Sequence, residues 1–271
     1  MDGFWTKTLL RIWAALILLF LFIPILLIFF YAFNTSNIES WPIPGLTLKW
    51  FGETWNDENV RAALLLSLQA GLMASALALV LGSFAAFAIH RTQFFGREVV
   101  SLLFVLPLAL PGIITGISLN AFFSFNGIPL SFWTIVVGHT TFCIVVVYNN
   151  VIARLRRTQG SLIEAAMDLG ANGFQVFRDI TLPLISTAVV AGGMLAFALS
   201  FDEVIVTTFT SGAQSTLPIW IFGQIRHGVL LPEVNVVVSF VILVTVIPVL
   251  IAARLTGGGG STRVPAAAEK T

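Results

Sequence analysis

The side chains of this sequence that could take part in chemistry are few, and they interrupt an apolar chain. Two adjacent carboxylates, Asp202 and Glu203, follow an apolar run that ends at Phe201. A carboxylate near bilayer depth costs ~2.5–3.5 kcal/mol on insertion scales, so such residues usually face a pathway. Paired acids beside an aromatic ring suit a cation that has lost its water. We hypothesise that these three residues line the outer gate of a pathway. The alternative is an acid pair that fixes helix depth or contacts another membrane subunit.

A second candidate set consists of helix breakers inside an apolar run. Pro107, Pro111, Gly112 and Gly116 interrupt residues 99–123. Broken membrane helices often line substrate paths because freed carbonyl groups can face a cavity. Pro111 and Gly112 are therefore candidate pathway residues, although kinks that serve packing explain the same pattern.

Catalytic and metal-binding arrangements are not expected. The three histidines share no ligand spacing, and the single cysteine, Cys143, can form neither a disulfide framework nor a CxxC site. His139 with Ser101 or Ser118 could suggest an intramembrane serine protease, but the sequence contains no G-x-S-x-G turn. An aspartyl protease would need carboxylates on two apolar segments, and only one offers any. We predict a non-enzymatic protein with no catalytic residue and no bound metal.

Composition indicates the environment in which these residues lie. The chain of 271 residues is 57% hydrophobic and only 10% charged, with a mean hydropathy of +0.95. Soluble domains are roughly a quarter charged, so the balance points to a polytopic membrane protein. The formal net charge of +1 lacks the excess of basic residues that is typical of nucleic-acid-binding proteins.

Six apolar segments approach or exceed the roughly 20 residues that a helix needs to cross the hydrocarbon. Their length and the lack of strict alternation favour helices over strands, so the expected fold is all-α and integral to the membrane. The first segment is longer than the ~7–15 residues of a signal-peptide core and lacks an A-x-A site, so we expect it to be retained. The expected crossings are Ile12–Phe33, Ala62–Ile89, Val99–Phe123, Phe132–Ile152, Pro183–Phe201 and Val234–Arg254.

Basic residues predict the orientation of these crossings. With the N-terminus in the cytoplasm, eleven lysines and arginines fall on inside segments and three on outside segments. Six crossings then place both termini in the cytoplasm. The inside residues are Lys7, Arg11, Arg91, Arg97, Arg154, Arg156, Arg157, Arg178, Arg254, Arg263 and Lys270; the outside ones are Lys49, Arg61 and Arg226.

The connecting segments follow from this topology. The outside loops are Asn34–Arg61, Asn126–Ser131 and Thr210–Glu233, and the stretch 217–233 is too short to span twice, so we expect an interfacial or re-entrant helix. Residues 1–256 form the expected transmembrane domain. Residues 257–271 have linker composition and are expected to be disordered.

The inside stretch 164–183 reads EAAMDLGANGFQVFRDITLP and contains a predicted helix–turn–helix. Ser161 and Glu164 form a capping-box pattern, and Gly170 can end the helix in the left-handed conformation. Asn172–Gly173 allows a turn, and Phe174–Asp179 is expected to form a second short helix. Pro183 suits the first turn of the next crossing. The residue types alone are equally compatible with a cytoplasmic loop whose acidic side chains only stabilise the N-terminus of a helix.

The spacing of this stretch resembles the EAA loop of bacterial ABC-importer permeases. That motif reads EAA, three residues, G, nine residues, I-x-L-P, and every named position is filled in 164–183. The resemblance implies a coupling helix at about 161–183 that docks in a groove of a separate ATP-hydrolysing subunit. The implied coupling residues are Glu164, Ala165, Ala166, Asp168, Gly170, Ile180 and Pro183.

The resemblance extends over most of the chain. The stretches 199–206 (LSFDEVIV), 217–218 (LP), 231–235 (LPEVN) and 106–112 (LPLALPG) are similar to the second permease subunit of spermidine/putrescine importers. This implies a type I ABC-importer permease fold, a multi-pass place in the bacterial inner membrane and polyamine cargo. It also implies four kinds of partner: two copies of an ATPase, a second and different permease chain, an extracytoplasmic substrate-binding protein and membrane lipid.

The chain itself lacks a G-x-x-x-x-G-K-[ST] loop, so ATP and Mg are expected on the partner ATPase and no cofactor on this chain. Other cargo stays open, including an opine, an amino-acid derivative, thiamine or iron. A secondary transporter would leave the EAA loop unexplained. Six helices without an internal repeat are also few for that class of protein. A membrane enzyme would need a catalytic constellation.

Overall fold

The computed structural model describes residues 3–228 and 230–257. Over this range the chain is helical, and β pairing is limited to an isolated antiparallel bridge between Asn34 and Leu46. The chain divides into two compact units. The first holds the residues up to Asp57 together with those from Gly223 on, and the second holds Glu58–Phe222.

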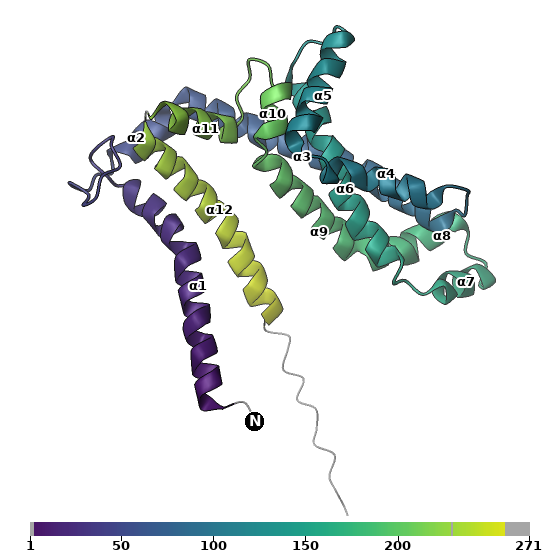
Figure 1. Cartoon of the computed structure of the whole chain (residues 1–271). Helices are drawn as coiled ribbons and strands as arrows, with labels where there is room; N and C mark the ends of the chain where they lie inside the picture. The colour runs from purple at the N-terminus through teal and green to yellow at the C-terminus, as the bar shows by residue number, and fades with distance from the viewer. Residues whose placement is uncertain (1–2, 229, 258–271) are drawn as a thin grey trace, which may run out of the picture. The chain divides into compact units, whose positions relative to one another are not determined.

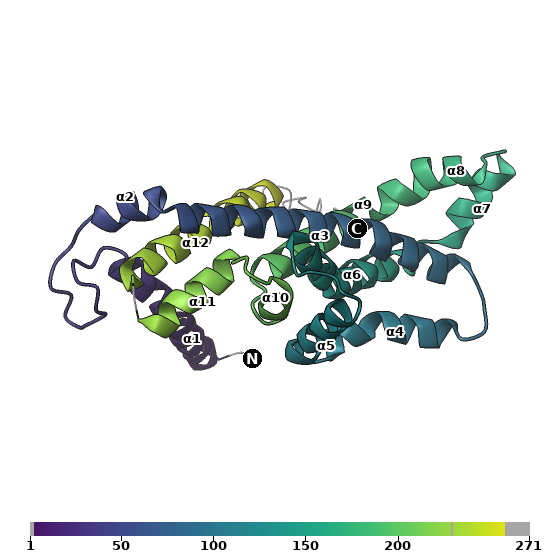
Figure 2. The same ribbon diagram turned by 90° about the horizontal axis from the view of Figure 1, so that it is seen from above.

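Three helices of the second unit pack side by side: α3 (Glu58–Arg91), α6 (Phe132–Leu155) and α9 (Leu182–Phe201) (Figures 1 and 2). The most apolar window of α6 is 67% buried, against 33% for α3, so α6 lies at the centre. Small residues recur every fourth position on α3, from Ala70 to Ala86, and let the α6 backbone approach closely. At Gly82 an added Cβ would lie 2.9 Å from the Ile144 carbonyl oxygen of α6.

The third predicted crossing is not one straight helix. It consists of α4 (Arg97–Ala109) and α5 (Gly112–Phe125), whose axes meet at 101°. Leu110 and Pro111 are extended, because proline has no N–H and disfavours helical geometry in the residue before it. The interruption predicted within Val99–Phe123 is therefore confirmed, and it lies at Leu110 and Pro111.

The first unit joins α1 (Phe4–Tyr31), α2 (Lys49–Asn56) and α12 (Leu231–Gly257). Ala32, Trp50 and Val236 form a small buried cluster where these helices meet. The Trp50 indole Nε1 donates to the Asn34 carbonyl oxygen at 2.7 Å, which fixes the loop between α1 and α2. The boundary between the two units falls within α11 (Leu217–His227), and this 11-residue helix is too short to cross a membrane.

Within the described residues, four helices are long and apolar enough to cross a membrane, and the bent pair α4–α5 makes up to five. The four are Trp5–Tyr31, Glu58–Arg91, Phe132–Leu155 and Gly173–Phe201. The sixth predicted crossing lies on α12, of which Leu231–Val246 is an apolar helix. The count of six and the 1–256 domain boundary stay predictions. The predicted tail, 257–271, lies outside the described residues except for Gly257, which is the last residue of α12.

Candidate functional site

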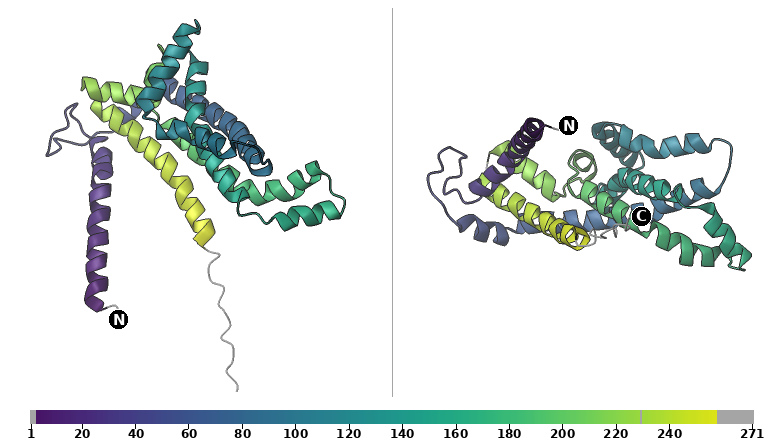
Figure 3. Two further views of the ribbon diagram at one scale, coloured as in Figure 1. Left: turned by 45° about the vertical axis from the view of Figure 1, so that its right-hand side comes forward. Right: turned by 90° about the horizontal axis from the view of Figure 1, so that it is seen from below.

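The EAA residues lie on a short surface helix, α7 (Gly160–Asp168), at one end of the second unit (Figures 1 and 3). Every side chain of α7 is exposed or half-exposed. The helix begins at Gly160 after Gln159, so Ser161 lies inside the first turn and cannot act as its N-cap. The predicted Ser161–Glu164 capping box is therefore wrong. Glu164 and Asp168 are both exposed, one helical turn apart.

Gly170 ends this helix in the left-handed conformation, as predicted, with φ = +89°. The Ala171 amide donates to the Ala166 carbonyl oxygen at 3.0 Å, and the Gly170 amide donates to that of Met167 at 2.9 Å. This pair of bonds is the Schellman motif, which requires a positive φ at the residue after the C-cap. The chain direction between α7 and the next helix therefore depends on Gly170.

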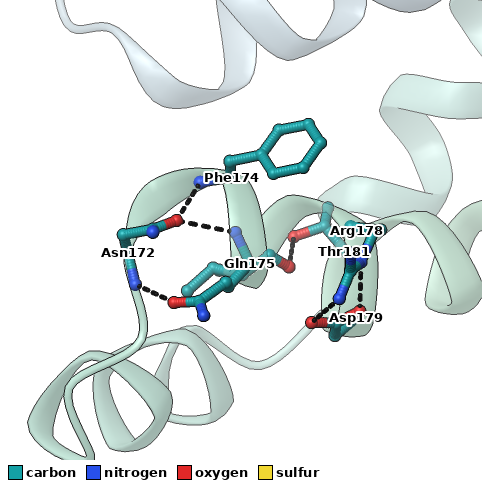
Figure 4. A network of polar contacts seen from close by, with 7 residues as sticks. Asn172, Phe174, Gln175, Arg178, Asp179 and Thr181 are labelled. Carbon is teal, nitrogen blue, oxygen red and sulfur yellow. Dashed lines mark hydrogen bonds and ion pairs between the residues drawn. The ribbon is translucent and has the colours of Figure 1, made fainter.

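The turn after Gly170 is closed by Asn172 and Gln175 (Figure 4). The Asn172 Oδ1 accepts from the Phe174 and Gln175 amides at 3.1 and 3.0 Å, and Gln175 Oε1 accepts from the Asn172 amide at 2.8 Å. This reciprocal capping box starts α8 (Gly173–Val176). Exposed Arg178 and Asp179 form a side-chain ion pair at 2.7 Å one turn further on.

The second short helix is not separate from the next crossing, which corrects the prediction for Phe174–Asp179. α8, the π-helical segment η1 (Phe177–Thr181) and α9 form one continuous run, Gly173–Phe201, of 29 residues. Pro183 lies in the first turn of α9, and the wider π turn before it accommodates a residue without an N–H. Ile180 lies within this π segment and is half-buried.

This continuity places the two candidate sites at opposite ends of one rod. At 1.5 Å per residue, 29 helical residues extend about 43 Å. The predicted coupling residues on α7 and Gly170 precede its start, and Asp202 with Glu203 follow its last residue, Phe201. A single continuous helix therefore connects the turn that follows α7 to the acid pair.

The two acids have different surroundings. Glu203 Oε1 accepts from the Val206 amide at 2.9 Å and so caps the short helix α10 (Ile205–Thr210). Asp202 is exposed at the end of α9, and partial desolvation by the surrounding protein raises its pKa above the usual value. Glu203 thus has a structural use, and Asp202 is the better candidate for contact with a cation. The Phe201 ring lies 5.9 Å from that of Phe197.

Sequence reasoning missed the residue that holds this turn, His139. Its ring is 1% exposed, and Nδ1 and Nε2 lie 2.7 Å from the hydroxyl oxygens of Ser200 and Thr207. Because Thr207 donates its proton to the Glu203 carbonyl oxygen at 2.7 Å, it accepts from His139 Nε2, and Ser200 donates to Nδ1. His139 thus joins α6 to the ends of α9 and α10. Ser101 bonds Tyr148 instead, at 2.7 Å.

The broken crossing lies beside the segment that follows the acid pair. An added Cβ at Gly112 would lie 3.8 Å from Ile205, and one at Gly116 would lie 2.6 Å from the Phe209 ring. The Asn120 amide also donates to the Phe209 carbonyl oxygen at 2.7 Å. Pro111 and Gly112 are thus brought next to α10. Close packing accounts for Gly116, and a pathway role for Pro111 and Gly112 stays a prediction.

Comparison with known proteins shows the family to which the chain belongs. The family model described as "Binding-protein-dependent transport system inner membrane component" matches residues 78–257. The chain is 36% identical over 248 residues to the spermidine/putrescine transport system permease protein PotC of Shigella flexneri, covering 89% of this chain and 92% of that protein. It is also 36% identical over 244 residues to the putrescine transport system permease protein PotI of Escherichia coli K12, covering 85% of each.

A solved structure shares the fold. A chain from a bacterial ABC transporter involved in the import of the acidic polysaccharide alginate superposes with a TM-score of 0.68. The match covers 91% of this chain and 95% of the other at 15% sequence identity. At that identity the likeness concerns the fold alone, which is the helical fold of an ABC-importer subunit.

Proposed function

The chain belongs to the family of binding-protein-dependent transport system inner membrane components, and from this premise we propose that it is the permease subunit of an ATP-driven polyamine importer. Two relatives at 36% identity carry spermidine and putrescine transport in their names, which supports this cargo. The subunit resides in the bacterial inner membrane as a multi-pass protein. It forms part of the translocation path, and a separate ATPase, which holds ATP and Mg, supplies the energy.

The proposal rests on the exposed hairpin of α7 and α8, residues 160–176, which we call the coupling hairpin. Leu169 is 89% exposed and Phe174 is 69% exposed, although both adjoin a polar turn outside the apolar crossings. Large apolar side chains that stay exposed in a polar segment mark a protein contact. Glu164 and Asp168 add a negative edge to the same surface. Together they suit a groove on a partner ATPase.

The mechanism follows from the rod that joins the hairpin to the acid pair. Closure of two ATPase copies moves the α7–α8 hairpin of each permease, and the continuous Gly173–Phe201 helix carries this movement across the membrane. His139 ties the far end of that helix to α6 and α10, so the Asp202 turn moves with them. ATP-driven transport is then a population shift between inward-open and outward-open arrangements.

The remaining partners follow from the surface and the family. The α1 helix is apolar and exposed along its length, with Phe20 77% exposed, which suits lipid and a second, different permease chain. Six crossings with both termini in the cytoplasm place the α7 hairpin inside and Asp202 outside. An extracytoplasmic binding protein then delivers the polyamine to a path that Asp202, Glu203, Phe201, Pro111 and Gly112 line.

Uptake of labelled spermidine and putrescine tests this proposal. Cells that lack the chain are complemented with wild type, with Glu164→Ala, or with Ser161→Ala, a control on the same helix outside the motif. Wild type and the control should restore uptake. Glu164→Ala should not, although binding of polyamine to the substrate-binding protein stays unchanged. If wild type restores no polyamine uptake but copurifies with an ATPase, the cargo is wrong and the permease role stands.

A further inference from the structure

A basic cavity lies where the end of α6 meets the first turns of α9, apart from the EAA residues and from the acid pair. It has a volume of about 360 Å³. Two arginines and two asparagines supply its polar lining, and Ala188 contributes from α9. The four polar residues are Asn149, Asn150, Arg154 and Arg157. No carboxylate among the described residues lines the cavity, so its guanidinium groups give it a formal charge of +2.

The two arginines of the cavity have no anionic partner in the described part of the chain. The ion pairs found there join Lys49 to Glu53 and Arg178 to Asp179. Arg154 Nε donates to the Leu184 carbonyl oxygen of α9 at 2.9 Å, which holds this side chain between the two helices. Because that bond uses Nε, the two terminal Nη groups stay available for an anion. Arg154 is thus positioned for an anionic ligand that the chain itself does not supply.

The two asparagines add neutral hydrogen-bonding groups to the same lining. The Asn150 amide nitrogen donates to the Val146 carbonyl oxygen at 2.8 Å, which orients its side chain, and Asn149 is exposed. An amide group can donate to a phosphate oxygen and accept from a hydroxyl group. Guanidinium groups match the geometry of phosphate oxygens. The lining therefore suits a phosphodiester that carries hydroxyl groups.

The cavity lies at the depth of lipid headgroups. Trp133, in the first turn of α6, is 60% exposed and suits a membrane–water interface. At 1.5 Å per residue, the stretch from Trp133 to Arg154 extends about 32 Å, close to the ~30 Å thickness of the hydrocarbon. Arg154 therefore reaches the opposite interface, at the end of the crossing that leads into the coupling hairpin.

An exposed apolar face adjoins the cavity on its membrane side. Ala188, Ala191 and Leu195 are spaced three and four residues apart along α9, so they share one helix face. Ala191 is exposed, and Leu195 is 53% exposed. A phosphate group in the cavity would thus be followed, toward the membrane interior, by a surface that suits acyl chains.

We propose that this cavity binds the headgroup of an anionic phospholipid, with the phosphate between Arg154 and Arg157 and the acyl chains along the exposed face of α9. Basic cavities between membrane helices on the cytoplasmic side are typical sites for such headgroups. The bound lipid joins the end of α6 to the start of α9 beside the coupling hairpin. The inference goes beyond the proposed function, because it concerns the membrane lipid and does not depend on the polyamine cargo.

Lipid binding to the purified importer tests the site. The importer, assembled with its permease partner and ATPases in detergent, is titrated with phosphatidylglycerol or with phosphatidylcholine of the same acyl chains. Native mass spectrometry counts the bound lipids. Wild type should bind phosphatidylglycerol more tightly than phosphatidylcholine. Arg154→Gln and Arg157→Gln should each weaken phosphatidylglycerol binding by about five- to tenfold, because each removes a charged donor.

Two further variants separate the cavity from the general positive charge of this surface. Arg156→Gln is the matched control, because Arg156 is exposed and lies between the two arginines but does not line the cavity. It should change the binding by less than about twofold. Ala188→Leu leaves every charge in place but fills part of the cavity, so it should weaken the binding. The Arg157 side chain makes no hydrogen bond among the described residues, so Arg157→Gln tests the site even if loss of the bond between Arg154 and Leu184 prevents assembly.

Each outcome decides for or against the lipid site. Weaker binding in Arg157→Gln and Ala188→Leu, with binding retained in Arg156→Gln, supports it. An equal loss in Arg156→Gln would reduce the effect to surface charge and overturn the site, as would equal binding of the two lipids by wild type. If inorganic phosphate displaces phosphatidylglycerol from wild type, the cavity holds a soluble anion and the lipid assignment is wrong. If Arg157→Gln keeps the lipid but releases the ATPase or the second permease, the cavity contacts a protein instead.

Discussion

Replacing Gly170 should uncouple the ATPase from transport without unfolding the permease. Gly170 has φ = +89°, and beyond Gly170 and its two chain neighbours no atom of the described residues comes within 4 Å of the position that a Cβ would take. The cost of Gly170→Ala is therefore the backbone cost of the left-handed conformation, about 1–2 kcal/mol, and not a steric clash. At an RT of about 0.59 kcal/mol this reduces the population of the native turn by roughly five- to thirtyfold. In the molecules that leave the native turn, the Gly170 and Ala171 amides lose their hydrogen bonds to the carbonyl oxygens of α7.

The assay compares ATP hydrolysis with uptake in the reconstituted importer. Gly170→Ala should lower uptake by roughly five- to thirtyfold while the permease still inserts and pairs, because the turn lies outside the packed helices. Gly170→Asn should recover part of the activity, since asparagine tolerates the left-handed region better than alanine. Gly160→Ala is the matched control. Gly160 also has open space around its Cβ position but does not need a positive φ.

Two results would refute this reasoning. If Gly170→Ala and Gly160→Ala transport equally well, the direction of the chain at Gly170 does not govern coupling. If Gly170→Asn is as inactive as Gly170→Ala, the loss does not follow from the left-handed conformation. In the second case, a circular dichroism spectrum equal to that of wild type excludes general misfolding as the cause of the loss.

Three further outcomes are expected. Gly82→Ala should lower the thermal unfolding midpoint of the purified importer, at a cost of about 1–3 kcal/mol, because its Cβ would lie 2.9 Å from the Ile144 carbonyl oxygen, whereas Gly160→Ala should not. His139→Leu should destabilise the folded importer by about 1–3 kcal/mol because the buried hydroxyls of Ser200 and Thr207 lose their ring partner. His139→Gln should recover part of this stability, and the thermal unfolding midpoint measures both effects. Desolvation raises the pKa of Asp202, so on acidification polyamine uptake should fall at a higher pH than an ordinary carboxyl group predicts, and Asp202→Asn should lack this step. The same raised pKa means that ionised Asp202 disfavours the folded state at neutral pH and that this penalty disappears as the pH falls through its folded pKa, so Asp202→Asn should not lower the unfolding midpoint.

Local signals in the sequence were sufficient for the helices and for one turn. Long apolar runs predicted α1, α3, α6 and α9 with ends that shifted by up to eight residues, because charged residues such as Lys7 continue a helix beyond its apolar part. Gly170 was predicted as a helix stop because few other residues adopt its backbone conformation. The break at Pro111 was also expected, but its 101° angle was not, because that angle depends on α5 packing against α10.

The failures at the coupling loop have a different cause. Ser161 has the spacing of a capping box with Glu164, yet the helix starts one residue earlier, at Gly160, and Asn172 with Gln175 forms the reciprocal cap instead. Both patterns satisfy the same local rule, and only the position of the helix start decides between them. The continuity of α8 with α9 was missed because a proline such as Pro183 usually marks the start of a helix. The π segment before it, which lets the helix continue through this proline, has no sequence signature.

His139 shows why a polar side chain in an apolar run cannot be assigned from the sequence alone. Its partners, Ser200 and Thr207, are 61 and 68 residues away, so their encounter depends on how α6, α9 and α10 pack. Thr207 in turn donates to the Glu203 carbonyl oxygen, so the network fixes the backbone of the acid pair and leaves the Asp202 carboxylate exposed. The rod that begins beside the EAA loop thus ends in a turn held by buried hydrogen bonds. The coupling proposed above acts over about 43 Å and depends on such a turn, because a loosely held turn would not reposition a carboxylate.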